Sequence, residues 1–235
     1  MRDVLDIHTH TLASGHAYST ISEMAAYAKE IGLELLGITE HAPKMPGTCH
    51  EFYFNNLKVV PREFNGMRLL LGAELNILDY DGNVDLSDRT LSELDVCVAS
   101  IHPPCFTSGT QKENTRAYLK AMEIPKVAII GHPDDGRFPI DYEELVLGAK
   151  ANHVLLELNQ GSLGPKSFRK NSRENAITML EYCKKYQVPV IMDSDAHITF
   201  DICNHEGPLS VVEECHFPEE LIVNRSVEEF MKFVQ

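Results

Sequence analysis

Histidines and acidic residues recur in this sequence at the spacing that metal sites use. His8 and His10 stand two residues apart near the start of the chain. Asp195 and His197 repeat this spacing much later in the chain. Side chains two residues apart in a strand lie on one face, so each pair can reach the same ion. Imidazole and carboxylate groups suit zinc, iron or manganese, and the pairs therefore predict metal-dependent chemistry.

Single residues of the same types close further apolar runs of the sequence. They are His41, Glu74, His102 and His132. One such histidine is most often structural, but burying so many ionisable groups costs free energy unless something pairs them. A cluster of divalent cations would supply that pairing. Glu40 falls on the opposite face from His41 in a regular strand, so we expect it to support the site rather than bind a metal.

These side chains follow apolar, β-branched runs that have the composition of buried strands. The runs cover residues 4–10, 35–41, 68–77, 96–102, 127–132, 154–159 and 188–193. All but the run at 154–159 carry histidine, aspartate or glutamate at or near their carboxyl end. In parallel α/β folds, sites are built at the carboxyl ends of the strands, so we expect these side chains to meet at one end of a sheet.

Segments with helical periodicity separate most of the apolar runs. They cover residues 22–31, 113–122, 142–151 and 173–186, and Ser22 and Asp141 are the expected N-caps. Strands that alternate with helices predict βαβ units and a parallel sheet. The 235 residues fit one α/β domain over residues 1–235, closed like a barrel.

The charge balance limits the partners of the protein. Lys plus Arg number 21 against 35 Asp plus Glu, a formal net charge of −14. Duplex nucleic acid is therefore not an expected partner, because its binding depends on basic residues that neutralise phosphates. Bound cations would still make one cleft locally positive, so a small phosphorylated substrate remains compatible with the charge.

Cysteine usage and hydropathy indicate a cytoplasmic protein that does not enter a membrane. None of the six cysteines forms a C-x-x-C pair, and several lie in apolar stretches, so we expect reduced thiols. The first apolar run begins at Val4, which leaves no room for a signal peptide. No run approaches the ~18 apolar residues that span a bilayer.

Residues in loops are weaker candidates. His16 follows the first strand and could reach the same site. Histidines without a strand-end position are expected to be structural; these are His50, His153, His205 and His216. Irregular stretches at 42–55 and 160–172 are candidate lids. Basic loop residues that could contact a substrate phosphate are Lys44, Arg137, Lys166 and Arg169.

Taken together, these motifs resemble the PHP (polymerase and histidinol phosphatase) domain family. The resemblance rests on the H-x-H at His8, the D-x-H at Asp195 and the single residues between them, and it covers nearly the whole chain. His16, the short length and the Gly131-His132-Pro133 form are similar to the YcdX-type stand-alone phosphatases. The resemblance implies a distorted (β/α)7 barrel that holds three divalent metal ions, zinc first, with iron or manganese as alternatives.

The resemblance also implies a role for each motif residue. The first metal would be bound by His8, His10, Glu74 and Asp195. The second would be bound by His16, His41 and His197. The third would be bound by Glu74, His102 and His132. In the expected mechanism, Asp195 or His197 would in addition relay protons. The subfamily implies a homo-oligomer, a trimer.

The expected reaction is hydrolysis of a phosphomonoester by direct attack of a metal-bound hydroxide, without a covalent enzyme intermediate. Three alternatives stay open: an amidohydrolase-type metal hydrolase, a PHP-type 3′ exonuclease, and a catalytically silent metal-binding module. The short chain and the set Glu74, His102 and His132 favour the phosphatase over the amidohydrolase. The acidic charge balance disfavours the exonuclease, and the full set of expected ligands disfavours the silent module.

Overall fold

A parallel sheet, nearly closed into a (β/α)7-type barrel, forms the body of the protein in a computed structural model that describes residues 3–234. Neighbouring strands pair in the order β1-β2-β4-β5-β6-β7-β8. Their bounds are β1 Leu5–Asp6, β2 Leu35–His41, β4 Met67–Asn76, β5 Cys97–Ser100, β6 Val127–Ile130, β7 Leu155–Asn159 and β8 Val190–Asp193. Each predicted run supplies one of these strands. A short strand that the sequence did not suggest, β3 (Glu63–Phe64), pairs antiparallel with β4.

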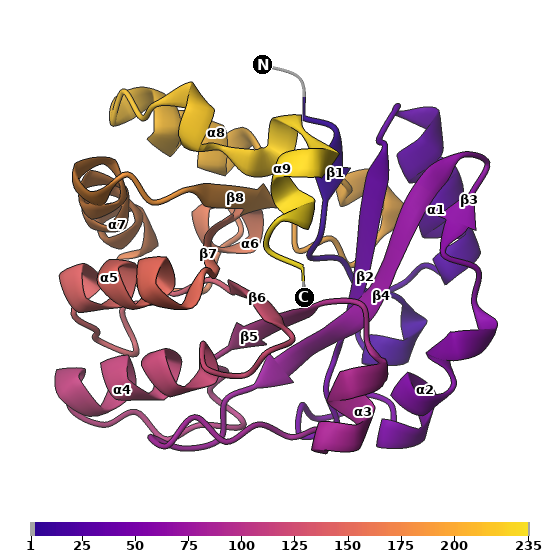
Figure 1. Ribbon diagram of the computed structural model, residues 1–235, viewed down its shortest axis with the longest axis horizontal. Coiled ribbons are helices and arrows are strands. Elements are labelled where there is room, and N and C mark those ends of the chain that lie inside the picture. The colour runs from indigo at the N-terminus through magenta and orange to yellow at the C-terminus, as the bar shows by residue number, and fades with distance from the viewer. Residues whose placement is uncertain (1–2, 235) are drawn as a thin grey trace.

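Helices surround the sheet, as Figure 1 shows, and the last of them lies over its centre. Their bounds are α1 Ile21–Glu30, α2 Glu51–Asn55, α3 Asp88–Glu93, α4 Gln111–Ala121, α5 Tyr142–Asn152, α6 Gln160–Leu163, α7 Ser172–Tyr186, α8 Glu206–Glu214 and α9 Val227–Met231. The four predicted helices correspond to α1, α4, α5 and α7. Within residues 3–234, no helix has both the length and the apolar character needed to cross a membrane.

Helix starts follow local capping chemistry. Asp141 caps α5 as predicted, because its side chain accepts a hydrogen bond from the backbone N–H of Glu144. The predicted cap of α1, Ser22, is wrong, since Ser22 lies within the first turn. Thr20 is the cap: it accepts from the Glu23 N–H at 3.3 Å, and Glu23 accepts from the Thr20 N–H at 2.7 Å. This reciprocal capping box satisfies two backbone donors that the helix leaves free.

The barrel interior is apolar at the amino ends of the strands and polar at their carboxyl ends. Inward-facing side chains such as Leu5, Val98 and Ile191 form a cluster with Phe230 of α9 and with Phe233. A larger apolar cluster fills the space between the sheet and the outer helices. The C-terminal segment therefore closes the floor of the barrel, and the opposite end is left for the polar residues.

The first strand pairs over a shorter length than its sequence suggests. Ladder pairing of β1 with β2 covers Leu5 and Asp6 rather than the whole of residues 4–10. Beyond Asp6, one backbone bond remains, from the Thr39 N–H to the Thr9 carbonyl at 2.9 Å. Side chains add two more: Thr9 Oγ1 donates to the Gly37 carbonyl at 2.6 Å, and Thr39 Oγ1 donates to the Ile7 carbonyl at 3.1 Å. These bonds keep the H-x-H segment beside β2 while its backbone leaves the regular strand.

The seam between the first and last strands is closed by hydrogen bonds of the side chains of Asn224, Asp6 and Asp193 rather than by a regular ladder. Thr9 and Ala196 form a parallel bridge there. Asn224, in the 3-10 turn η5 (Val223–Arg225), accepts from the Met192 N–H at 2.8 Å and donates to the Met192 carbonyl at 2.6 Å. Its own carbonyl accepts from the Val4 N–H at 2.8 Å. Asn224 thus supplies several of the bonds that a strand ladder would otherwise make.

Candidate metal centre

Glu74 of β4 lies at the middle of the carboxyl end of the barrel and is fully buried. Its Oε1 lies 3.1 Å from Nε2 of His102 and 3.0 Å from Nε2 of His132. His132 has a backbone φ of +32°, an uncommon conformation for a residue other than glycine. The turn after β6 therefore holds this imidazole against Glu74 at some conformational cost.

The second oxygen of Glu74 faces three further imidazoles. Glu74 Oε2 lies 2.6 Å from Nδ1 of His41, 3.3 Å from Nε2 of His8 and 3.5 Å from Nε2 of His10. These histidines come from β2, a neighbour of β4 in the sheet, and from the segment after β1, which pairs with β2. One carboxylate is thus shared by histidines on both of its sides.

Asp195 lies across from Glu74, in the turn after β8. Its Oδ1 lies 3.2 Å from Nε2 of His10 and 3.6 Å from both Nε2 of His8 and Nδ1 of His197. The backbone φ of Asp195 is +54°, in the left-handed region. Asp195 and His132 are thus two residues of the cluster that have a positive backbone φ. Such strained backbone is typical of sites whose geometry matters for function.

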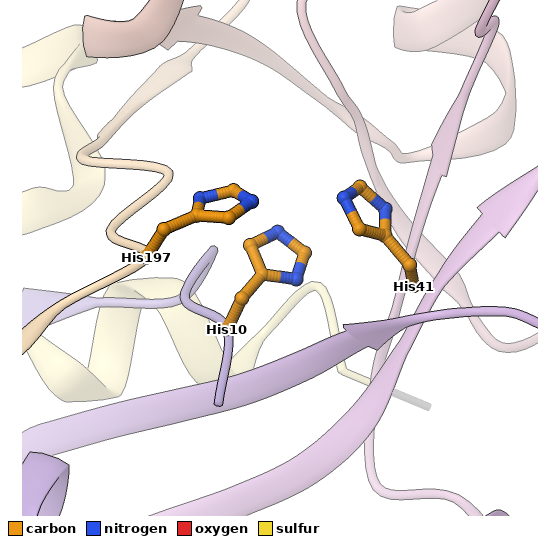
Figure 2. Close-up of side chains that lie close together, drawn as sticks. All are labelled: His10, His41 and His197. Carbon is orange, nitrogen blue, oxygen red and sulfur yellow. The ribbon is translucent and has the colours of Figure 1, made fainter. Parts of the chain in front are cut away.

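Figure 2 shows that His10, His41 and His197 point toward one another from three different segments of the chain. The ring of His16 joins them, with centroids 4.9 Å from His41 and 4.8 Å from His197. His16 is more exposed than the rest of the cluster. The structure thus brings all nine predicted side chains to one end of the barrel.

Several buried donor atoms in this cluster lie close to one another but make no hydrogen bond of acceptable geometry within the described residues. They are His8 Nε2, His10 Nε2, His41 Nδ1, Glu74 Oε2 and Asp195 Oδ1. Buried polar atoms normally find a partner, so such a concentration calls for an absent group. The donors are imidazole and carboxylate, which is the chemistry that divalent zinc, iron or manganese requires. The residues therefore fit a metal cluster.

The donor atoms form overlapping groups, each compact enough for a separate ion. Within each group the donor atoms lie within 4.8 Å of one another. The groups are His8, His10 and Glu74; His10, His41 and His197; and His41, Glu74 and His102. Shared members mean that the ions would be close neighbours, which is the arrangement of multinuclear sites.

The electrostatics of the cluster prepare most donors for metal binding. Burial and the nearby His41 and His197 hold the pKa of His10 well below its usual value, so its imidazole is neutral. Burial alone would raise the pKa of Glu74, but the surrounding imidazoles outweigh it and lower that pKa well below its usual value. Neutral imidazole and ionised carboxylate are the forms that bind metal ions.

Glu157 of β7 is a supporting residue that sequence reasoning missed. Its Oε1 lies 2.6 Å from Nδ1 of His8, and its Oε2 accepts the His132 backbone N–H at 2.6 Å. Asn76 supports His102 in the same way, with Oδ1 2.8 Å from Nδ1. Such partners fix the orientation and tautomer of a ligand histidine. The available signal was a glutamate within an otherwise apolar strand.

Glu40 has the supporting position that its place on β2 predicted. Its Oε2 accepts from Ser14 Oγ at 2.6 Å and from the Thr11 N–H at 3.0 Å. Ser14 Oγ in turn lies 3.1 Å from Nδ1 of His10. Glu40 therefore acts on the cluster through the loop that carries His10.

A pocket of about 630 Å³ opens above the cluster. Both predicted lid stretches contribute to its wall, with Met45 from one and Lys166, Phe168 and Arg169 from the other. The guanidinium of Arg169 lies 3.1 Å from both Asn159 Oδ1 and Ser162 Oγ. A positive charge is thus fixed beside the donor cluster.

Arg169 also touches the cluster itself. Its Nη2 lies 3.6 Å from Asp195 Oδ2, and its side chain is 7% exposed, so the ion pair is shielded from water. The other basic candidates are placed differently. Arg137 pairs with Asp135 at 2.9 Å, and Lys44 is exposed and does not line the pocket in the described part of the chain.

The histidines predicted to be structural lie outside the strand-end cluster. His50 accepts from the Phe52 N–H and so caps α2. His153 ends α5 in a left-handed conformation, and its ring stacks on Phe233. His205 pairs with Asp3 through Nδ1 at 2.7 Å. His216 also has a positive φ, after the end of α8.

Comparison with known proteins agrees with this picture. The family model described as "PHP domain" matches residues 6–217. A probable phosphatase of Clostridium novyi (strain NT) is 45% identical over 235 residues, covering 100% of this chain and 96% of the relative. A probable phosphatase of Caldicellulosiruptor saccharolyticus is 45% identical over 231 residues, covering 98% and 95% of the two chains.

The fold has a solved counterpart. A histidinol phosphate phosphatase from Lactococcus lactis, crystallised with zinc, L-histidinol and phosphate, superimposes with a TM-score of 0.62. The match covers 92% of this chain and 95% of that one at 17% sequence identity, so it is evidence for the shared fold. The family match and the relatives go further: the chain belongs to the PHP domain family.

Proposed function

We propose that this chain is a metal-dependent phosphomonoesterase that uses three divalent ions, zinc first, with iron or manganese as alternatives. The observation that carries the proposal is the set of buried donor atoms without partners around Glu74. The relatives named probable phosphatase support a hydrolase of phosphoric esters. The zinc and phosphate bound by the structural neighbour support the same chemistry on this fold.

The proposed ligand sets follow the contacts of the two carboxylates. The first ion would be held by His8, His10, Glu74 and Asp195. The second would be held by His16, His41 and His197. The third would be held by Glu74, His102 and His132. When bound, the ions would lower the pKa of a water molecule and neutralise charge on the phosphoryl oxygens.

The protein's own groups would position the substrate and move protons. Arg169 points a guanidinium at the pocket beside Asp195, where it can donate two parallel hydrogen bonds to a phosphate. His197 is partly exposed on the pocket wall, and Asp195 lies next to it. We assign these two residues the transfer of a proton to the leaving oxygen. The pocket volume of about 630 Å³ suits a small phosphorylated molecule.

The test is turnover after metal loading. The protein is stripped with a chelator, reloaded with zinc, manganese or iron, and assayed with p-nitrophenyl phosphate. We expect activity that returns with about three ions per chain. Glu74→Gln should lose more than one ion and nearly all activity, whereas Glu51→Gln, on the exposed surface beside Ser87, should keep both.

Other outcomes would identify the alternatives. Turnover of amides or lactones alone would indicate an amidohydrolase. Release of nucleotides from a single-stranded 3′ end, without monoesterase activity, would indicate an exonuclease. Three bound ions without turnover on a broad phosphoester panel would indicate a silent metal-binding module. The trimer and the cytoplasmic location stay predictions, to be checked by light scattering and by fractionation.

A further inference from the structure

A second group of metal-type side chains lies outside the strand-end cluster. It consists of Asp3, just before β1, and of Cys203 and His205, just before α8. One donor atom from each lies within 4.8 Å of the other two. Asp3 and His8 stand five residues apart on one extended segment, about 16 Å, so this group is distinct from the cluster around Glu74.

Two buried polar atoms in this group have no hydrogen-bond partner within the described residues. Asp3 uses Oδ2 to contact Nδ1 of His205 at 2.7 Å, while its Oδ1 remains without a partner. Nε2 of His205 is likewise buried and without a partner. The side chains of His205 and Asp3 are 1% and 10% exposed, so water cannot readily satisfy these atoms. Unsatisfied buried groups of this kind indicate an absent ligand.

The charges around the thiol of Cys203 point to a cation. Burial, with the carboxylates of Asp6, Asp3 and Asp193 acting in the same direction, raises the pKa of Cys203 to about 12. Asp6 also accepts the Cys203 backbone N–H at 2.7 Å, which keeps its charge close to the sulfur. Without a cation the thiol is protonated. A coordinated divalent ion would offset the negative charge of these carboxylates. It would also displace the thiol proton, because a thiol that coordinates a metal ion is deprotonated.

We propose that Asp3, Cys203 and His205 form a second zinc site, with a water molecule as the fourth ligand. Thiolate, imidazole and carboxylate are together a donor set that suits zinc and leaves one position of a tetrahedron open. On binding, the thiol proton passes to solvent and a sulfur–zinc bond forms. The ion would join the segment before β1 to the turn before α8, two parts of the chain that are far apart in sequence.

Cobalt distinguishes this site from the other, because the donor groups at the strand ends contain histidine and carboxylate but no thiol. The metal-free protein is titrated with Co²⁺ alone and followed by absorption. We expect a thiolate-to-cobalt charge-transfer band in the near ultraviolet. Cys203→Ser should abolish the band, and Cys215→Ser, which replaces a buried thiol beside α8, should leave it intact.

Metal counting provides the second measurement. Wild-type protein loaded with zinc should hold one ion per chain more than Cys203→Ser, while the two have equal phosphatase activity. If Cys203→Ser does not fold, Asp3→Asn is tested in its place. This variant keeps the thiol and should weaken cobalt binding at least tenfold. A fully loaded wild type without the charge-transfer band, or a band that persists in Cys203→Ser, would overturn the proposal. Neither result depends on whether the protein is a phosphatase.

Discussion

At the residue scale, the nine clustered side chains owe their geometry to residues that would touch no ion. His8 is the clearest case, because Glu157 holds its Nδ1 at 2.6 Å and so leaves Nε2 facing Glu74 and Asp195. The same carboxylate fixes the backbone of His132. A single residue of β7 therefore orients histidines on two sides of the centre.

This double role gives a direct prediction for Glu157→Gln. The amide keeps the shape but removes the charge that stabilises the ring proton of His8, so metal affinity should fall by about 10–100-fold. Competition with a chromophoric chelator measures the change. Glu143→Gln is the matched control, because Glu143 accepts a hydrogen bond from Lys185 on the exposed surface. Unchanged affinity in Glu157→Gln would show that the carboxylate does not act on the centre.

The pH dependence of metal binding should reflect His8. Burial alone would lower the pKa of His8, but the carboxylates of Glu157, Glu74 and Asp195 outweigh it and raise that pKa well above its usual value. The ion-free protein therefore carries a proton that an ion must displace. Affinity should fall as pH decreases, by about tenfold per unit while one proton is displaced. Calorimetry in buffers of different ionisation enthalpy counts the protons, and Glu157→Gln should release fewer at neutral pH.

The residues that sequence reasoning found and those it missed differ in where they stand. Histidines and acids at or near the carboxyl end of a predicted strand are conspicuous, because a polar residue rarely ends a buried strand without a reason. Glu157 and Asn76 also lie within strands, but their value depends on contacts with the segment after β1 and with the turn after β5 that only the closed sheet creates. A glutamate within an apolar strand is a visible signal, but the sequence does not show which residue it contacts.

At the scale of elements, close approach of neighbouring strands sets the position of Glu74. Gly72 precedes it on β4, and a Cβ at Gly72 would lie 1.8 Å from the carbonyl oxygen of Val96. That atom belongs to the backbone and cannot rotate away. β4 and the segment leading into β5 can therefore lie this close only with glycine at position 72.

Gly72→Ala should destabilise the protein by about 3 kcal/mol or more, because overpacking against backbone forces the strands apart. Urea unfolding gives the change in the free energy of unfolding. Gly148→Ala is the control: a Cβ there meets the flexible side chain of Leu119, and alanine favours the helix by about 1 kcal/mol. Equal stability of the two variants would contradict the argument.

The loop at 160–172 carries a second prediction at this scale. Arg169 is held by Asn159 and Ser162, and Ser162 donates in turn to Asp134 at 2.8 Å. Arg169→Lys should raise the KM for a phosphomonoester by about 10–100-fold, since a hydrogen bond to a charged group contributes about 1.5–3 kcal/mol. Inhibition by inorganic phosphate should weaken in parallel. Arg137→Lys, which lies outside the pocket wall, should leave both unchanged.

The order and type of the main elements could be predicted, but their ends could not. Strand and helix periodicity located seven strands and four helices because burial imposes a regular pattern on each. The cap of α1 was misplaced since Thr20 and Ser22 are both good capping residues, and the contact with Glu23 decides between them. Helix α9, which closes the floor of the barrel, was missed because its five residues are too few to show a helical period.

At the scale of the whole molecule, the metal centre and the fold should depend on each other. Removing the ions leaves several buried donor atoms without partners. One ion present at a thousand times its dissociation constant stabilises a protein by about 4 kcal/mol. For a chain of this size that corresponds to a fall in Tm of roughly 10 °C on removal of one such ion. Scanning calorimetry with and without a chelator measures it, and Glu74→Gln should show a much smaller difference.

The contacts of Asn224 bear on when the metal centre can assemble during synthesis of the chain. His8 and His10 are synthesised well before their partners Asp195 and His197, which follow nearly two hundred residues later. Asn224, which fastens the strands that carry them, comes later still. We therefore expect a nascent chain to complete the centre only after the segment that carries Asn224 has emerged. Chains truncated before Asn224 should bind metal ions with lower affinity.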